Sequence, residues 1–529
     1  MTKKTTKRKG TGTVDALIVG AGAAGCLYAA KLAQAGKKVL VLEAGHDWSL
    51  DDLVSSQIWA RRLKWGGTPV ERGGTNPFSH NHGTGEGFGG AALHHFGTWP
   101  RMRPDDFHTR SKYGQGLDWP ISYDDLRVYY DEIQEDVGIS GDARKEIWRP
   151  PGTPYPMPPL ETFAQGRILA RGFEKMGLHT APLPLIVNSR AYKGRAPCMY
   201  DGWCEAGCPT GALANPLVTY FQQAQRAGAE FRAHCRVTRV LTDAQKGHAT
   251  GVEYVEAGER REQYAKVVIL AASVVQNPRI MLNSASDKHP QGLSNRNGLV
   301  GAYITMDVLA LMYGLFAEET ENHRGVNAGQ LLHRGDFTGA GRPYGPYQWQ
   351  IAPSMKPNDL LGIATTRPDL FGNDLHRFMR RATKHLASMA GFAGGIALRG
   401  NRVELAPDKD VDGMPRARLV HSFGADTLAL WDHLVAQGHS VMKAAGAKES
   451  DIWNGTPVGS HLIGGTVMGQ SAADSVTDSY GRAHEVKNLV LAGSGLFPAG
   501  SGTSPTYTLH AVTLRSTRHM LAHWNDYAV

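Results

Sequence analysis

The sequence of 529 residues predicts a mixed α/β fold, and three observations support this class. Residues 14–45 are typical of a strand, a glycine-rich turn, a helix and a second strand. Residues 267–285, VVILAASVVQNPRIMLNSA, again indicate a buried strand, a turn of small residues and a helix. Glycine is abundant, with 63 residues, which favours tight turns and close approach of the backbone to a ligand. We therefore expect a parallel sheet with helices packed against it.

The first of these units carries a phosphate-binding pattern. Gly20, Gly22 and Gly25 follow the apolar run 14–19 with the spacing G-x-G-x-x-G. The first glycine permits a tight turn, the second lets the backbone approach a pyrophosphate, and the third lets helix and strand pack closely. Glu43, near the end of the second strand, is placed to accept hydrogen bonds from ribose hydroxyls. The pattern predicts a Rossmann-like dinucleotide site, and its position near the start of a long chain favours FAD over NAD; a glycine-rich turn without a ligand is the alternative.

Composition and charge indicate a soluble globular protein. Hydrophobic residues make up 41% of the chain and charged residues 20%, which is typical of globular domains. The net charge is +8, but five cations lie within the first nine residues, so the rest of the chain carries only +3. We expect residues 1–12 to form a disordered basic tail, and contact of this tail with an acidic partner or a lipid is the alternative. The charge pattern gives no indication of binding to nucleic acid.

No segment is expected to span a membrane. The stretch closest to a membrane span, residues 301–316, is short and carries Asp307. The basic start of the chain is followed by a strand-like segment and not by a secretory signal. Five cysteines in a chain of this length do not resemble a secreted disulfide framework. These features predict a protein made without its own export signal.

Three of the five cysteines lie close together, as Cys198, Cys204 and Cys208 in the segment CMYDGWCEAGCP. A disulfide would use two of them, and a structural zinc site usually has four ligands. Thiolates favour iron–sulfur clusters, copper(I) or zinc, and a proline after the last cysteine is shared with ferredoxin-type ligand runs. The spacing predicts a metal site, and a vestigial site or a reactive thiol patch is the alternative.

Further motifs carry a resemblance to a known family. They are GTGEGFGGAALHHFGTWPRM (83–102), SHLIGGTVMG (460–469) and NLVLAGSGLFPAGSGTSPTYTLHAVTLRSTRHM (488–520). Together with the amino-terminal unit they resemble the glucose–methanol–choline (GMC) family of flavin oxidoreductases, over nearly the whole chain. Within it, LDWPISYDDLRVYYDE (117–132) and the cysteine segment look like the bacterial branch of FAD-dependent glucose, glucoside and gluconate dehydrogenase catalytic subunits. Pyranose oxidases are more distant relatives.

The resemblance implies two interleaved domains. A Rossmann-like FAD-binding domain would comprise residues 13–115, 196–300 and 480–529. A substrate-binding domain on a mostly antiparallel sheet would comprise residues 116–195 and 301–479, including cap segments.

A catalytic pair is implied as well. The family's base lies in a segment like HLIGGTVMG, which places it at His461, and a neutral imidazole can take a hydroxyl proton near pH 7. The family's second residue is a His or Asn in a segment like NPTLT, but the matching stretch here is SPTYT, with Ser504. A serine has one hydroxyl with which to position the substrate oxygen, directly or through water. His510, in the following helical stretch, is the alternative second residue, although packing in the core is the commoner role of such a histidine.

The resemblance assigns further residues to cofactors. Gly90 and His94 lie in the loop that packs against the flavin ring. A histidine at the place of His94 bonds covalently to the flavin in pyranose oxidases but not in related dehydrogenases, so covalent attachment stays open. Gly493 and Ser494 would lie at the phosphates and the ribityl chain, and Val237 would hold the adenine through its backbone. In the bacterial dehydrogenases the cysteines that match Cys198, Cys204 and Cys208 bind a 3Fe–4S cluster.

The function expected from this resemblance is FAD-dependent dehydrogenation. A hydroxyl of a sugar or glycoside, or of another alcohol, would be oxidised to the ketone or lactone by hydride transfer to flavin N5. Electrons would pass through the cluster to a cytochrome or other external acceptor. A small accessory subunit would carry an export signal, which predicts action in the periplasm; without it the protein is expected in the cytoplasm. The alternatives are an oxidase of the pyranose-oxidase type without a cluster, and a flavoprotein lyase, isomerase or electron-transfer module.

Residues that determine specificity are harder to predict. Tyr347, Trp349 and Phe371 are aromatic side chains of the kind that line sugar sites, and core packing is the commoner role for each of them.

Overall fold

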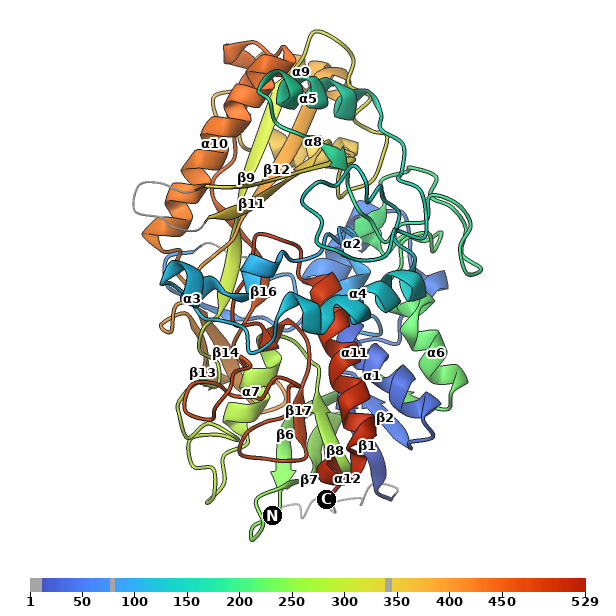
Figure 1. Ribbon diagram of the computed structural model, residues 1–529, viewed down its shortest axis with the longest axis vertical. Helices are drawn as coiled ribbons and strands as arrows, with labels where there is room; N and C mark the ends of the chain where they lie inside the picture. Colours follow the sequence, from blue (N-terminus) through green and yellow to red (C-terminus); the bar gives the residue numbers. More distant parts are fainter. Residues whose placement is uncertain (1–11, 77–80, 338–344) are drawn as a thin grey trace.

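The computed structural model describes residues 12–76, 81–337 and 345–529, so most of the predicted basic tail lies outside the described residues. The fold is a mixed α/β fold, as predicted. Figure 1 shows its two large sheets toward opposite ends of the long axis, with strand β16 (Val458–Ile463) between them. Among the described residues, no helix is both long and apolar enough to cross a bilayer.

The first sheet is the predicted parallel sheet, and seven strands of the described residues form it. Five strands form its parallel part, with β1 at the centre beside β8 and β2. They are β1 (Val14–Val19), β2 (Val39–Leu42), β5 (Glu230–Arg232), β8 (Glu259–Leu270) and β17 (Leu489–Leu491). The amino-terminal half of the long strand β8 continues into an antiparallel extension with β7 (Ala249–Glu256) and β6 (Cys235–Thr242). Strands from three distant parts of the chain therefore meet in one sheet, which requires a fold assembled from discontinuous segments.

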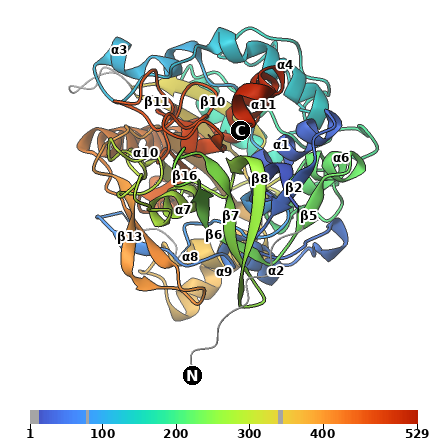
Figure 2. The same ribbon diagram turned by 90° about the horizontal axis from the view of Figure 1, so that it is seen from below.

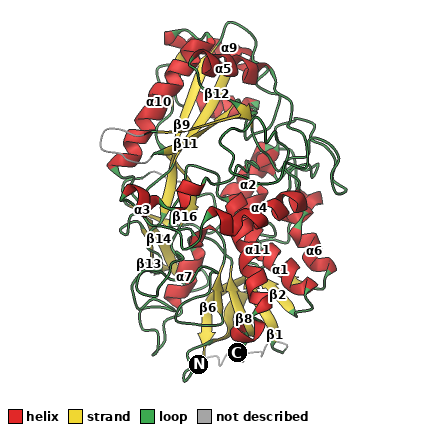
Figure 3. Cartoon of the chain, viewed as in Figure 1, coloured by secondary structure: helices red, strands yellow, loops and turns green. Residues whose placement is uncertain are grey.

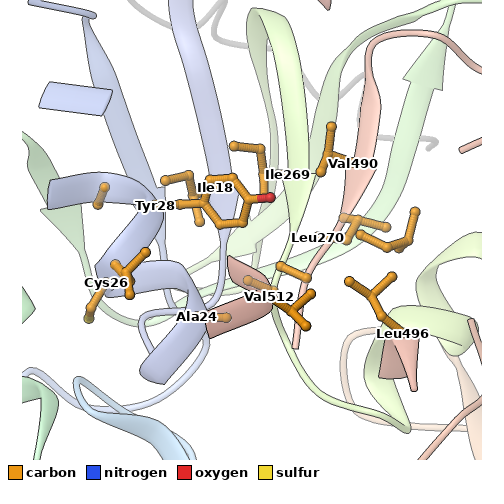
Figure 4. Packing of buried hydrophobic residues seen from close by; sticks show 14 of the residues in the cluster. Ile18, Ala24, Cys26, Tyr28, Ile269, Leu270, Val490, Leu496 and Val512 are labelled. Carbon is orange, nitrogen blue, oxygen red and sulfur yellow. The ribbon is translucent and has the colours of Figure 1, made fainter. Parts of the chain in front are cut away.

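Helices cover this sheet through a continuous apolar core. Helix α1 (Ala23–Gln34) packs between α6 (Tyr220–Arg226) and α11 (Thr506–Ala522), and Figure 2 shows these helices side by side. The close-up in Figure 4 shows Ile18, Ile269 and Val490 on neighbouring strands, next to side chains of α1 and α11. Burial of each such side chain contributes about 1.5–3 kcal/mol. This core fixes the position of the turn between β1 and α1.

The second sheet is antiparallel, and seven strands can be assigned to it within the described parts of the chain. Its order is β15, β9, β12, β11, β10 and β4, and β16 pairs with the lower part of β9. The bounds are β4 (Ala181–Pro182), β9 (Thr305–Leu315), β10 (Leu331–Asp336), β11 (Pro346–Ile351), β12 (Leu386–Ala393) and β15 (Ile452–Asn454). One face packs on α5 (Ala164–Lys175) and α10 (Ala425–Ala445) through a second apolar core. The other face lies toward the loop 499–505 that precedes α11.

The remaining elements connect and flank the two sheets, as the colouring by secondary structure in Figure 3 makes clear. A small third sheet joins β3 (Glu71–Gly73), β14 (Pro415–Val420) and β13 (Arg402–Lys409). The other helices are α2 (Gln57–Trp65), α3 (Thr109–Tyr113), α4 (Tyr123–Val137), α7 (Gln276–Asn283), α8 (Pro357–Ala364), α9 (Gly372–His385) and α12 (Trp524–Tyr527). The domain boundaries expected from the sequence stay a prediction.

Candidate active site

A small pocket lies beside β16, the strand between the two large sheets. Strand β9 contributes Asp307, β16 contributes His461, and the segment 497–505 contributes much of the remaining wall. Met102, from the second glycine-rich loop, completes one side. The predicted base therefore lines a cavity between elements that are far apart in the sequence.

His461 is held in one orientation by two contacts. Its Nδ1 lies 2.8 Å from Oδ2 of Asp307, and its ring stacks on Phe392 with 5.1 Å between centroids. The backbone of His461 has a φ of +53°, a left-handed conformation that non-glycine residues adopt infrequently. Such conformations cost about 1–3 kcal/mol and persist where the surroundings enforce them. The side chain keeps 23% of its surface exposed, so the imidazole remains accessible from the cavity.

Asp307 is the buried partner of this histidine. It is 5% exposed, and its carboxylate also accepts backbone N–H groups from Gly395 and Gly502. Burial raises the pKa of Asp307 above its ordinary value, and the hydrogen bond and charge of His461 act in the opposite direction. A carboxylate that accepts from Nδ1–H leaves Nε2 of the imidazole as the free acceptor. The pair can therefore take up a proton at Nε2 and spread the resulting charge.

Ser504 is near this site but does not line the cavity, whereas its neighbours Thr503 and Pro505 do. Its hydroxyl accepts a hydrogen bond of 3.4 Å from Nε2 of Gln350, and the residue is 5% exposed. The role of Ser504 in positioning the substrate oxygen stays a prediction. His510 is packed between Trp99 and its own helix, where its Nδ1 bonds to the Thr506 carbonyl oxygen.

The glycine-rich turn has the shape that a dinucleotide needs. Gly20 has a φ of +101°, and a Cβ there would lie 2.6 Å from the Ala271 carbonyl oxygen. A Cβ at Gly25 would lie 2.0 Å from the Gly20 carbonyl oxygen, so both glycines are required by the protein's own packing. A Cβ at Gly22 would meet nothing closer than 3.9 Å, the Cα of Gly90. Helix α1 begins after Gly22 without a side-chain cap, which leaves its N-terminal amides free for an anion.

Glu43 is buried at the end of β2 and already has several partners. Its carboxylate accepts backbone N–H groups from Ala21, Gly45 and Gly87 at 2.8–2.9 Å. Burial raises the pKa of Glu43. These bonds connect the phosphate-binding turn to the second glycine-rich loop and leave little remaining acceptor capacity for a ribose hydroxyl. Val237 lies on β6, which starts two residues earlier with a bond from the Cys235 N–H to the Glu43 carbonyl oxygen.

The predicted flavin loop contains a histidine with one unpartnered ring nitrogen. His94 follows the short 3₁₀ helix Gly90–Leu93, and its Nε2 is buried without a hydrogen-bond partner among the described residues. Burial lowers the pKa of His94 to about 4, so the ring is neutral at pH 7. Gly493 has open space where a Cβ would be, and Ser494 donates to the Leu462 carbonyl oxygen near His461. The unpartnered Nε2 of His94 and the open space beside the backbone of Gly22 and Gly493 fit a bound FAD.

The three clustered cysteines are free thiols, and each sulfur accepts a backbone N–H group. The donors are Tyr200 for Cys198, Leu213 for Cys208 and Asn327 for Cys204. Burial raises the pKa of Cys198 to about 12 and also raises the pKa of Cys204, and the charge of the Cys208 thiolate acts in the same direction on both. Within the described ranges, no three His, Cys, Asp or Glu side chains are arranged to share one metal ion. The predicted iron–sulfur cluster is therefore not supported by a preformed single-ion site and stays a prediction.

Two side chains at the candidate site, Asp307 and Gln350, are not predicted from the sequence. Asp307 was noted only as a charge that argues against a membrane span, yet a lone carboxylate inside an apolar strand is itself a signal. Gln350, which bonds to Ser504, was also missed.

The aromatic residues considered for the pocket lie elsewhere. Tyr347 and Trp349 are buried in the core between the second sheet and α10, which is the commoner role named for them. Phe371 is 81% exposed at the start of α9.

The chain is similar to known proteins over most of its length. Family models described as GMC oxidoreductase match residues 14–305 and 397–513. The chain is 30% identical to 2-methyl-1,2-propanediol dehydrogenase of Mycolicibacterium austroafricanum, over 97% of this chain and 96% of the relative. It is 27% identical to the fructose dehydrogenase large subunit of Gluconobacter japonicus, over 96% and 98% of the two chains. It is 26% identical to the gluconate 2-dehydrogenase flavoprotein of Pantoea cypripedii, over 96% and 93%.

A solved structure supports the fold independently. The crystal structure of pyridoxine 4-oxidase from Mesorbium loti matches with a TM-score of 0.68 at 15% identity. The match covers 97% of this chain and all of the other.

Proposed function

The chain belongs to the GMC oxidoreductases, a family of FAD-binding enzymes that act on CH–OH groups, and from this premise we propose that it is a dehydrogenase of a sugar or related polyhydroxyl compound. The observation that carries the proposal is the pair His461–Asp307, which lines the cavity between the two sheets. Bound FAD would supply the acceptor for the two electrons and the hydrogen that leave the carbon.

The chain's own residues would handle the hydroxyl proton. Asp307 accepts from Nδ1–H of His461 and so fixes the tautomer in which Nε2 carries a lone pair toward the cavity. Nε2 takes the proton of the substrate hydroxyl, and the carboxylate stabilises the imidazolium that forms. Phe392 keeps the ring plane in place by stacking, so the imidazole needs no reorganisation when it becomes charged.

The turn between β1 and α1 would hold the cofactor. Gly22 and Gly90 offer two backbone surfaces without side chains to the pyrophosphate, and the N-terminus of α1 favours its negative charge. His94, neutral and with an unpartnered Nε2, would contact the flavin. Covalent attachment through this nitrogen is tested by whether denaturation releases the flavin.

The named relatives favour the substrate class. The names of the three relatives above denote a diol, a sugar and a sugar acid, and each such compound has hydroxyl groups on adjacent carbons. All three are called dehydrogenases or dehydrogenase subunits, which favours an external acceptor over dioxygen.

We further propose that Cys198, Cys204 and Cys208 bind a 3Fe–4S cluster that passes electrons to this acceptor. In such a cluster each thiolate binds a different iron, so the sulfurs need not converge on one ion. Backbone N–H groups at all three sulfurs are suited to the charge of a cluster. Leu213, whose backbone N–H donates to the Cys208 sulfur, packs its side chain where Gly97 of the predicted flavin loop lacks a Cβ. A partner subunit, suggested by the name of the fructose dehydrogenase large subunit, would receive the electrons.

The proposal is tested with anaerobically purified holoenzyme and a panel of sugars, sugar acids and diols. We expect at least one compound to bleach the flavin absorbance, and we expect about three irons per chain. If no alcohol bleaches the flavin, the dehydrogenase proposal is wrong. If bleaching occurs without iron and air yields stoichiometric hydrogen peroxide, the enzyme is an oxidase and the cluster proposal is wrong.

A further inference from the structure

Gln348 is a fully buried amide without a partner. It lies on β11, is 0% exposed, and neither its Oε1 nor its Nε2 has a hydrogen-bond partner among the described residues. A glutamine amide offers two donors and a carbonyl oxygen with two lone pairs, and leaving all of them unpaired in the interior is unfavourable. Most buried polar side chains are paired, so this one requires an explanation.

The neighbours of Gln348 place it next to the candidate active site, behind the residues that line the cavity. Across the strand pair β11–β12 it lies opposite Phe392, the residue that stacks on His461. Across β10–β11 it lies opposite Arg334, which donates to the Thr503 hydroxyl at 2.8 Å.

The same face of β11 carries a second contact with the site. Gln350, two residues on and therefore on the same face, donates to Ser504. Three neighbours of Gln348 on this face therefore contact the site, namely Phe392, Arg334 and Gln350. The Gln348 amide itself has no hydrogen-bond partner among the described residues.

The cavity wall itself has an unpartnered polar group. Ser501 lines the cavity, is 3% exposed, and its hydroxyl has no hydrogen-bond partner among the described residues. Two unpaired groups, one on the cavity wall and one on the adjoining face of β11, indicate a ligand with more than one polar group. A monohydric alcohol, whose single hydroxyl is engaged by His461, would satisfy neither of them.

We propose that the Gln348 amide binds a hydroxyl group of the substrate other than the one that is oxidised, and so selects polyhydroxyl substrates over monohydric alcohols. An amide that donates and accepts is suited to a hydroxyl, which also does both. A site built to hydrogen-bond a hydroxyl rejects the analogue that lacks it, because the buried polar group is then left unpaired. This inference rests on the proposed function and deepens it by naming what the site recognises.

The variant Gln348→Met tests the proposal, because methionine has a similar length and cannot form these bonds. The holoenzyme is assayed with D-fructose, D-glucose, D-gluconate and 1,2-propanediol, and with 1-propanol and cyclohexanol. We expect kcat/KM for the best polyol to fall about 10–100-fold, with little change for the monohydric alcohols. We also expect an unchanged or higher Tm without substrate, since no bond within the protein is lost.

Gln437→Met is the matched control. Gln437 bonds to Tyr347 and Trp349 on the opposite face of β11. This variant should lower the Tm and leave the preference for polyols unchanged.

Three results would overturn the inference. One is an equal loss for polyols and monohydric alcohols. Another is no loss for either. The third is a lower Tm or failure to fold of Gln348→Met, which would mean that the amide is bonded within the protein or to a structural water. A measurement that needs no variant supports or overturns it as well: on the wild type, at least one deoxy analogue of the best polyol must lose about 10–100-fold in kcat/KM.

The test separates this inference from the proposed function. If no alcohol is oxidised, the dehydrogenase proposal fails, and polyol binding is then measured by thermal shift. A Tm increase with polyol in the wild type that is absent in Gln348→Met still supports recognition by Gln348. An equal increase in both proteins, or none in either, overturns it.

Discussion

Replacing Asp307 by asparagine tests the central pair with the smallest change of shape. The variant Asp307→Asn keeps one oxygen that can accept from His461, but it removes the negative charge. It also places an NH₂ group where the carboxylate accepts from His461, Gly395 and Gly502. Because an NH₂ group cannot accept, either a backbone N–H loses its partner or the imidazole changes to the tautomer with hydrogen on Nε2. In that tautomer Nε2 cannot take the substrate proton.

The size of the effect follows from the geometry. The Nδ1–Oδ2 distance of 2.8 Å puts the centres of charge about 4 Å apart once His461 is protonated, which is worth about 4 kcal/mol at an effective dielectric constant of 20. Solvent near the 23% of the histidine side chain that is exposed reduces this value. We therefore expect Asp307→Asn to slow proton removal by about 10²–10³-fold.

The assay is anaerobic stopped-flow bleaching of the flavin with the best alcohol. The limiting rate should fall while the apparent Kd for the substrate changes less than about 3-fold, because the charge acts on the protonated state and not on binding. Asp410→Asn, which breaks the ion pair with Arg279 away from the cavity, is the control and should leave the limiting rate unchanged. A limiting rate for Asp307→Asn within about 3-fold of the wild type, at equal FAD content, would refute the reasoning.

Four further predictions concern the base, the cofactor turn, the cysteine segment and the buried histidines. His461→Asn, which tolerates the left-handed backbone, should slow flavin bleaching at least about 10²-fold; a rate near that of the wild type would exclude His461 as the base. Gly22→Val should lower FAD content with little loss of stability in the apoprotein, whereas Gly20→Ala should lower its Tm, because only Gly20 needs a positive φ. Cys198→Ser should lower iron content and dye reduction but not anaerobic bleaching, and unchanged iron content would count against the cluster. Burial lowers the pKa values of several histidines below 6.5, three of them at the candidate site and the flavin loop, so the unfolded chain binds more protons than the folded chain between about pH 6.5 and 4. The free energy of unfolding, measured by urea titration, should fall as pH falls through this window. These three histidines are His94, His95 and His510.

The fold was largely predictable because its signals are local. The strand 14–19, the glycines after it and the helix that follows are specified within one short stretch, and the structure contains β1 and α1 there. The order of the strands is not a local property. Strand β17 joins the sheet beside β8 from more than 200 residues away, and nothing within either segment specifies this partner. Only the resemblance to the GMC family predicted that the amino-terminal, middle and carboxy-terminal segments belong to one domain.

The candidate site also combines a local signal with a contact that is not local in the sequence. His461 belongs to a recognisable motif, whereas Asp307 lies 154 residues away and becomes its partner only because β16 pairs with β9. The register places Ser460 opposite Asp307, and an irregularity in the strand pair after Ser460 brings the next side chain toward the carboxylate. A sequence predicts strands more readily than it predicts an irregularity in their pairing. The contact between His461 and Asp307 therefore could not be predicted from the sequence.

Strand β11 explains why the aromatic residues were a poor guide to the substrate pocket. Its sequence PYQWQI alternates apolar and polar residues, a pattern that predicts one face in the core and one in solvent. The apolar face does pack on α10, but every residue of the strand is buried, Gln348 and Gln350 included. The polar face is covered by the loop 499–505, which belongs to the other end of the chain. A polar strand face that the rest of the fold buries must find its hydrogen bonds inside the protein or on a ligand. Gln350 forms such a bond with Ser504, whereas the Gln348 amide has no partner among the described residues. Gln348 is therefore a better indicator of the substrate than the aromatic residues are.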